Sequence, residues 1–259
     1  MAVEITRRLK PEEEEILRKR AELDAIKATL AERELELADL RSHLAAFEGR
    51  YLRQVGVLYA ELDEWKARIA EFRAQRNPSG AARRQSEEAR EQARQTHEAA
   101  HGDASKPPDF TPSPELKRLF REVARKIHPD FAKDDPADRD LRTRLMAEAN
   151  RAYEAGDADA LRRILDEYDD SADAIQGEGV GAELIRIIRQ ISQARKRIAS
   201  IEQESATLRQ SEVARLEQDA ENAKQQGRDL LAELAAAARQ QIQLARQEHE
   251  ALLREVSPL

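Results

Sequence analysis

The stretch Ser113–Asp130, SPELKRLFREVARKIHPD, decides how the middle of this chain folds. Its apolar side chains recur at three- and four-residue spacing, which places them on one face of a helix. Ser113 is placed to cap this helix, and Pro114 suits its first position, where a missing N–H costs nothing. Pro129 disfavours helical geometry at His128, so we expect the helix to end there. The apolar face comprises Leu116, Leu119, Phe120, Val123, Ala124 and Ile127.

A basic face and a second helix accompany this first one. The basic face comprises Lys117, Arg118, Arg121, Arg125 and Lys126. The end of the helix places His128 and Asp130 on a rigid corner beside this face. After a short polar loop, Asp135 and Pro136 can begin another helix, and Gly156 is a natural stop for it. Its apolar stripe is Leu141, Leu145, Met146, Ala149, Ala152 and Tyr153. The two stripes predict an antiparallel helix pair.

Two segments together resemble the J-domain family, the DnaJ-type co-chaperones. LKRLFREVARKIHPD resembles the second helix of that family with its His-Pro-Asp tripeptide, and AEANRAYEAGD resembles the third helix. The resemblance runs from Ser113 to about Tyr168, and the family's usual short first helix has no counterpart directly before it. It implies that His128, Pro129 and Asp130, with the basic helix, dock on a DnaK-type chaperone ATPase and favour its hydrolysis-competent state. It also implies that this protein is not itself an enzyme.

Two other interpretations of the corner remain. The helix pair could be a degenerate J-like module, kept only for packing within a coiled-coil scaffold that has no co-chaperone activity. A hydrolytic pair of His128 and Asp130 is disfavoured, because no nucleophile, phosphate-binding loop or metal cluster accompanies it. We therefore expect no catalytic residue and no cofactor.

The composition sets limits on the rest of the chain. Of its 259 residues, 37% are charged and only 4% are aromatic, which is too polar for one large globular core. The net charge of −7 is modest and both signs are interspersed, so we expect no nucleic-acid-binding surface. The absence of cysteine excludes disulfides and thiolate metal sites. No apolar run reaches membrane-spanning length and no signal peptide is recognisable, so we expect a cytoplasmic protein without membrane contact.

A heptad repeat occupies Pro11–Gln75 and predicts one long helix. A second apolar set lies three residues after the first until Tyr51 and four residues after it from there on, which indicates a register shift inside the helix. Such a stripe cannot be buried by its own helix and needs a partner. The repeat comprises Ile16, Leu23, Leu30, Leu37, Leu44, Tyr51, Leu58, Trp65 and Phe72, with companions Ile26, Leu40, Phe47, Val55, Leu62 and Ile69.

A second heptad region, Ala182–Glu255, predicts another long helix, with a good apolar seam up to Leu208 and beyond it a thinner, alanine-rich stripe that Gly227 weakens. The fold class is therefore all-α. We expect the two long helices to form an antiparallel hairpin with the small J-like domain between them; a parallel homodimer is the alternative, and self-association through the coiled coil stays open. The expected domains are a long helix (1–76), a polar linker (77–112), the J-like domain (113–170), a glycine-rich joint (171–181) and a second long helix (182–257).

The expected linker contains one motif that resembles a metal site. His97-Glu98-Ala99-Ala100-His101 matches the HExxH pattern of zinc peptidases, in which both His residues bind zinc and the Glu activates water. Its flanks provide no apolar wall and no evident third ligand. We interpret the match as coincidental and expect no bound metal.

Overall fold

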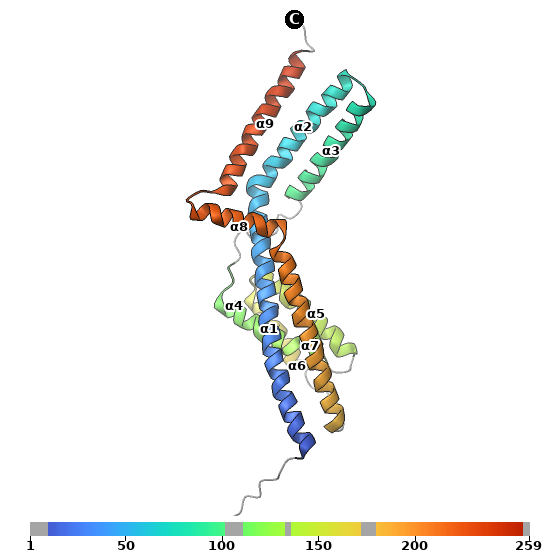
Figure 1. Ribbon diagram of the computed structural model, residues 1–259, viewed down its shortest axis with the longest axis vertical. Coiled ribbons are helices and arrows are strands. Elements are labelled where there is room, and N and C mark those ends of the chain that lie inside the picture. Colours follow the sequence, from blue (N-terminus) through green and yellow to red (C-terminus); the bar gives the residue numbers. More distant parts are fainter. Residues whose placement is uncertain (1–9, 102–110, 133–135, 172–179, 256–259) are drawn as a thin grey trace, which may run out of the picture. The chain divides into compact units, whose positions relative to one another are not determined.

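The structure is a computed structural model that describes residues 10–101, 111–132, 136–171 and 180–255 (Figure 1). These residues form helices and contain no strand, so the predicted all-α class is confirmed. The chain divides into two compact units built from discontinuous segments, Met1–Ser42 with Phe110–Arg209 (unit 1) and His43–Asp109 with Gln210–Leu259 (unit 2). The α-helices are α1 (Pro11–Tyr51), α2 (Val57–Arg76), α3 (Gly80–His101), α4 (Pro114–Ile127), α5 (Pro136–Glu154), α6 (Ala158–Ser171), α7 (Val180–Arg209), α8 (Glu212–Gln225) and α9 (Leu230–Arg254).

Unit 1 is built around α4, α5 and α6. The Ser113 hydroxyl accepts a hydrogen bond from the Leu116 N–H at 3.1 Å, which confirms the predicted cap of α4, and every residue of the predicted apolar face of α4 is buried. The α5 helix runs antiparallel to α4. Arg142, near the start of α5, donates a hydrogen bond to the Lys126 carbonyl at the end of α4, and the ring of Tyr153, near the end of α5, has its centroid 4.7 Å from that of Phe120. Gly156 follows α5 at a φ of 72°, a conformation that suits glycine and stops the helix there.

The first half of α1 carries two buried stripes, where the heptad repeat predicted one. Leu30 and Leu37 belong to the predicted stripe and pack against Ile187, Ile191 and Ile201 of α7. A second stripe faces the core of α4, α5 and α6. This second stripe comprises Ala31, Leu35 and Ala38. The α1 helix therefore covers α4, α5 and α6 directly, which was not predicted from the sequence.

The long helices pair in parallel, so the predicted antiparallel hairpin is wrong within each unit. In unit 1, Arg20 pairs with Glu183, Glu34 with Arg197, and Arg41 with Glu204, and the residue numbers rise together. In unit 2 the pairs Glu61–Arg246, Arg73–Glu248 and Arg76–Glu255 rise together in the same way. Both pairings lie within one chain and need no second copy.

Within unit 2 the chain reverses its direction at α3. The predicted hairpin had placed such a reversal in the second heptad region. The α3 helix runs back along α2, because the Thr96 hydroxyl donates to Asp63 at 2.9 Å and Gln85 lies beside Arg73. The expected polar linker, 77–112, thus contains a helix of unit 2. Only Ala93 of α3 is buried, so its polar sequence gave no apolar stripe by which to recognise the packing.

Two breaks interrupt the regions that were predicted as continuous helices. A short π-helix, Leu52–Gly56, separates α1 from α2 where the heptad companions change from three to four residues on. A π-helical turn contains about one residue more than an α-helical turn, so the apolar positions after it are rotated about the helix axis. The π-helix thus accounts for the predicted register shift. The second heptad region is three helices instead of one, because Ser211 caps α8 and Gly227, at a φ of 74°, precedes the Asp229 cap of α9.

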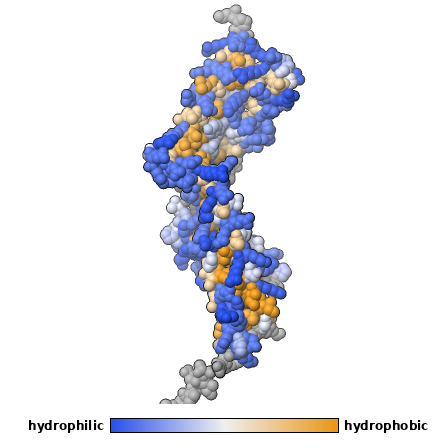
Figure 2. All heavy atoms as spheres, viewed as in Figure 1, coloured by the Kyte–Doolittle hydropathy of each residue, from blue (hydrophilic) through white to orange (hydrophobic). Residues whose placement is uncertain are grey.

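The visible surface is mostly hydrophilic, with apolar residues gathered in limited patches between charged ones (Figure 2). Among the helices of the described residues, none combines the length and the apolar character that crossing a bilayer requires.

Candidate functional site

The ring of His128 is buried, with 2% of the residue exposed. It follows the last turn of α4, and Pro129–Phe131 continue as a short 3₁₀ turn. The Nδ1 atom of His128 accepts a hydrogen bond from the Asp130 N–H at 3.2 Å, and Nε2 lies 3.0 Å from Glu34 Oε1. An accepting Nδ1 places the proton of the neutral ring on Nε2, which then donates to the Glu34 carboxylate.

Glu34, in the middle of α1, is the centre of this site and is itself 4% exposed. Besides His128, it binds Arg197 of α7, whose Nε and Nη2 donate to the two carboxylate oxygens at 2.7 and 3.1 Å. Burial alone would raise the pKa of Glu34, but the hydrogen bonds from His128 and Arg197 outweigh burial and hold this pKa below its ordinary value of 4.5. We call Glu34, His128 and Arg197 the Glu34 cluster.

The pH dependence of stability should carry the signature of this carboxylate. A carboxyl group with a lowered folded-state pKa contributes stability above its unfolded pKa, and that contribution is lost as the pH falls through the folded value. The difference in unfolding free energy between wild type and Glu34→Gln should therefore be largest above pH 4.5 and shrink below it. Urea unfolding at several pH values measures this difference. A difference that grows on acidification would contradict the assignment.

The rest of the corner is covered by α7. Phe131 is 5% exposed and packs with Ile187 and Ile191, and its carbonyl accepts a hydrogen bond from Gln190 at 3.3 Å. Asp130 is partly exposed. Its Oδ2 atom lies 3.8 Å from His128 Nδ1 and has no hydrogen-bond partner among the described residues. The α4 helix therefore ends at His128 as predicted, but the His128 side chain is buried against α1 and α7 of unit 1.

The predicted basic face of α4 is divided between two environments. Lys117 Nζ pairs with Asp39 at 2.7 Å, and Arg121 Nη1 lies 3.4 Å from Glu32, so these two cations contact α1. The Asp39 carboxylate also accepts a hydrogen bond from the hydroxyl of Tyr153. The pKa of Tyr153 is raised by burial and by this hydrogen bond. In contrast, the side chains of Arg118, Arg125 and Lys126 are exposed.

Three residues of the site, Glu34, Asp39 and Arg197, were not identified from the sequence. Each lies in a heptad region rich in charged residues, where an acidic or basic side chain is ordinary. One signal was present: Glu34 lies beside Leu35 and three residues before Leu37, and both leucines are buried on different stripes. A charge between two buried stripes needs a partner.

The HExxH residues lie on α3 in unit 2. The rings of His97 and His101 stack with centroids 4.2 Å apart, and His97 Nδ1 is 3.5 Å from Glu64. Glu98 pairs with Arg94 at 2.9 Å. Within the described ranges, no group of three or more His, Asp or Glu side chains is arranged to hold a metal ion.

The chain was compared with models of protein families, with curated protein sequences and with solved structures. None of the three comparisons gave a match.

Proposed function

We propose that this protein is a J-domain-type co-chaperone of the cytoplasm, which docks on a DnaK-type chaperone and stimulates its ATP hydrolysis. The observation that carries the proposal is the His128-Pro129-Asp130 corner between antiparallel α4 and α5, on a compact core completed by α6. Docking would use this corner and the basic residues of α4. The long helices would serve self-association, client binding or targeting.

The burial of His128 adds a condition to this proposal. With 2% of the residue exposed, the ring is out of reach of a partner while the Glu34 cluster is intact. We infer that the described arrangement is a closed state, in which Arg118, Arg125 and Lys126 are exposed at the surface and would make a first, charge-steered contact. Exposure of the corner would then require Glu34 and Arg197 to release it.

The same burial favours a second candidate function. A coiled-coil scaffold could retain the corner as a structural ion-pair cluster, with His128 and Glu34 fixing the J-like helices on α1. Such a protein would not stimulate any chaperone, whichever residue of the cluster is changed. A substitution that weakens the Glu34 cluster should therefore increase chaperone stimulation by a co-chaperone and leave it absent for a scaffold.

The ATPase rate of the host's DnaK-type chaperone, measured with added protein, separates the two functions. Glu34→Gln should stimulate more than wild type, because loss of about 1.4 kcal/mol from a closed state increases a minor open population about tenfold. Adding His128→Gln to Glu34→Gln should abolish the stimulation. Glu36→Gln, at an exposed position two residues away, is the matched control and should behave as wild type.

Circular dichroism must show unchanged helicity in each variant for this comparison. Stimulation that survives His128→Gln in the Glu34→Gln background would reject docking through the corner. If neither wild type nor Glu34→Gln stimulates the chaperone, the scaffold function is the correct one.

A further inference from the structure

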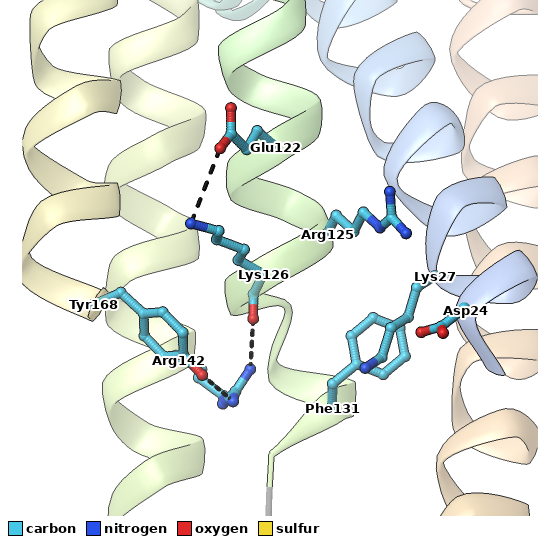
Figure 3. A pocket seen from close by; sticks show the side chains of 8 residues that line it. All are labelled: Asp24, Lys27, Glu122, Arg125, Lys126, Phe131, Arg142 and Tyr168. Carbon is cyan, nitrogen blue, oxygen red and sulfur yellow. Dashed lines mark hydrogen bonds and ion pairs between the residues drawn. The ribbon is translucent and has the colours of Figure 1, made fainter. Parts of the chain in front are cut away.

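A pocket of about 590 Å³ opens beside the corner in unit 1 (Figure 3). Its walls come from α1, α4, α5 and α6, and Phe131 forms part of its lining. Its volume is within the range of small-molecule binding pockets. Four cations line it: Lys27, Arg125, Lys126 and Arg142.

Two of these cations form no ion pair with a carboxylate among the residues that the structure describes. Lys27 is partly buried, and its Nζ lies 5.0 Å from the centre of the Phe131 ring. Arg125 approaches from the opposite wall and makes neither a hydrogen bond nor an ion pair with any described residue (Figure 3). Both side chains are long and can adjust to a ligand between them.

Arg142 supplies a third positive charge that is fixed in place. Its guanidinium is held by Asp138 at 2.9 Å, by the Lys126 carbonyl at 3.0 Å and by the Tyr168 hydroxyl. The group also lies over the Tyr168 ring, 4.9 Å from its centre. Because three of its five N–H donors are already used, Arg142 contributes its field to the pocket more than a direct bond.

The two carboxylates of the pocket do not balance these charges. Glu122 lies 3.9 Å from Lys126 on the same helix. Asp24 favours the charged form of Lys27, but burial and the nearby Arg142 and Arg125 prevail, so the pKa of Lys27 is lowered from its ordinary value of 10.5. A partly buried ammonium that forms no ion pair is costly, and a bound anion would offset that cost.

We propose that this pocket binds a phosphate group, either free or as the monoester of a small solute, between Lys27 and Arg125. A guanidinium and an ammonium on opposite walls suit the several oxygens of a tetrahedral dianion, and the field of Arg142 favours its double charge. The volume leaves room for an organic part beside the phosphate. The pocket shares Arg125 and Lys126 with the proposed docking face, but Lys27 and Arg142 are not docking residues, so a change at Lys27 tests phosphate binding separately from docking.

Titration calorimetry with inorganic phosphate, at ionic strength held constant with chloride, tests the proposal on the full chain. Lys27→Met should weaken phosphate binding at least tenfold, while Arg118→Gln, which removes an exposed cation of α4 outside the pocket, should leave it unchanged. Without phosphate, Lys27→Met should melt at or above the wild-type temperature, because it removes an unpaired charge and keeps an apolar stem. This control separates lost binding from lost folding.

A second measurement follows Lys27 directly. In NMR spectra of lysine-labelled protein, phosphate should raise the pKa of Lys27, because a bound anion favours the ammonium form. Glycerol 3-phosphate as a second probe distinguishes the sources: tighter binding than inorganic phosphate assigns a monoester, and weaker binding assigns free phosphate. Equal phosphate affinity in wild type and Lys27→Met, or no heat beyond the chloride control, would overturn the proposal.

Discussion

Replacing Glu34 by Ala should lower the free energy of unfolding of unit 1 by about 3 kcal/mol, because it leaves the buried His128 and the partly buried Arg197 without their shared carboxylate. The expected value lies at the lower end for broken buried ion pairs. Arg197 retains a side chain that is 32% exposed and can turn toward water. Chemical denaturation followed by circular dichroism measures the loss.

Glu36→Ala provides the matched control for this variant. Glu36 lies on the same helix, and among the described residues it pairs with Arg33 alone in an exposed ion pair, so its loss should change stability by no more than about 0.5 kcal/mol. If Glu34→Ala were as mild as Glu36→Ala, the Glu34 cluster would not hold the corner in solution.

The largest loss from a single apolar side chain is expected for Phe120→Ala. Phe120 is fully buried in the core of α4, α5 and α6 and packs against Tyr153, so its truncation should cost about 4 kcal/mol. Hydrogen exchange read by mass spectrometry should show the loss of protection in α4, α5 and α6.

Phe72→Ala is the comparison in unit 2. Phe72 is partly exposed and meets His249 with ring centroids 6.2 Å apart, so its truncation should cost less and affect α2 and α9. Faster exchange in α2 and α9 after Phe120→Ala, equal to that in α4, would contradict the division into two units.

Local signals in the sequence were sufficient for α4 and its corner. The Ser113 cap, the apolar face and Pro129 act within a few residues of one another, so the start, the buried face and the end of α4 follow without tertiary information. The change of heptad companions after Tyr51 likewise indicated a register shift, because such a shift must alter the pattern of apolar residues, and the structure forms this shift as the π-helix Leu52–Gly56.

The direction of helix pairing could not be obtained in this way. A heptad stripe has the same spacing in parallel and antiparallel pairs, and the choice depends on how the intervening chain returns. In unit 2 the chain returns along α2 through α3, and this helix was not recognised because its sequence has few apolar residues and only Ala93 of it is buried. The continuous second helix was wrong for a related reason: Ser211 and Asp229 act as caps inside a region whose heptad spacing continues across them.

The partners of His128 were beyond prediction because they come from segments far along the chain. Glu34 precedes His128 by 94 positions, and Arg197 lies on a different helix again. The residues that resemble a known family could be read from one stretch. The residues that cover them depend on the packing of α1 and α7.

The Glu34 cluster joins three separate segments, and this has a thermodynamic consequence. Since Glu34 binds Arg197 and His128 with one carboxylate, the association of α1 with α7 and the burial of the corner are linked equilibria. Linkage is reciprocal. If separation of α1 from α7 strengthens the binding of a partner to the His128 imidazole by some factor, then binding of that partner weakens the α1–α7 association by the same factor. The pairing of α1 with α7 would then respond to occupancy of the corner, and the exposure of the corner would respond to any force that separates these two helices.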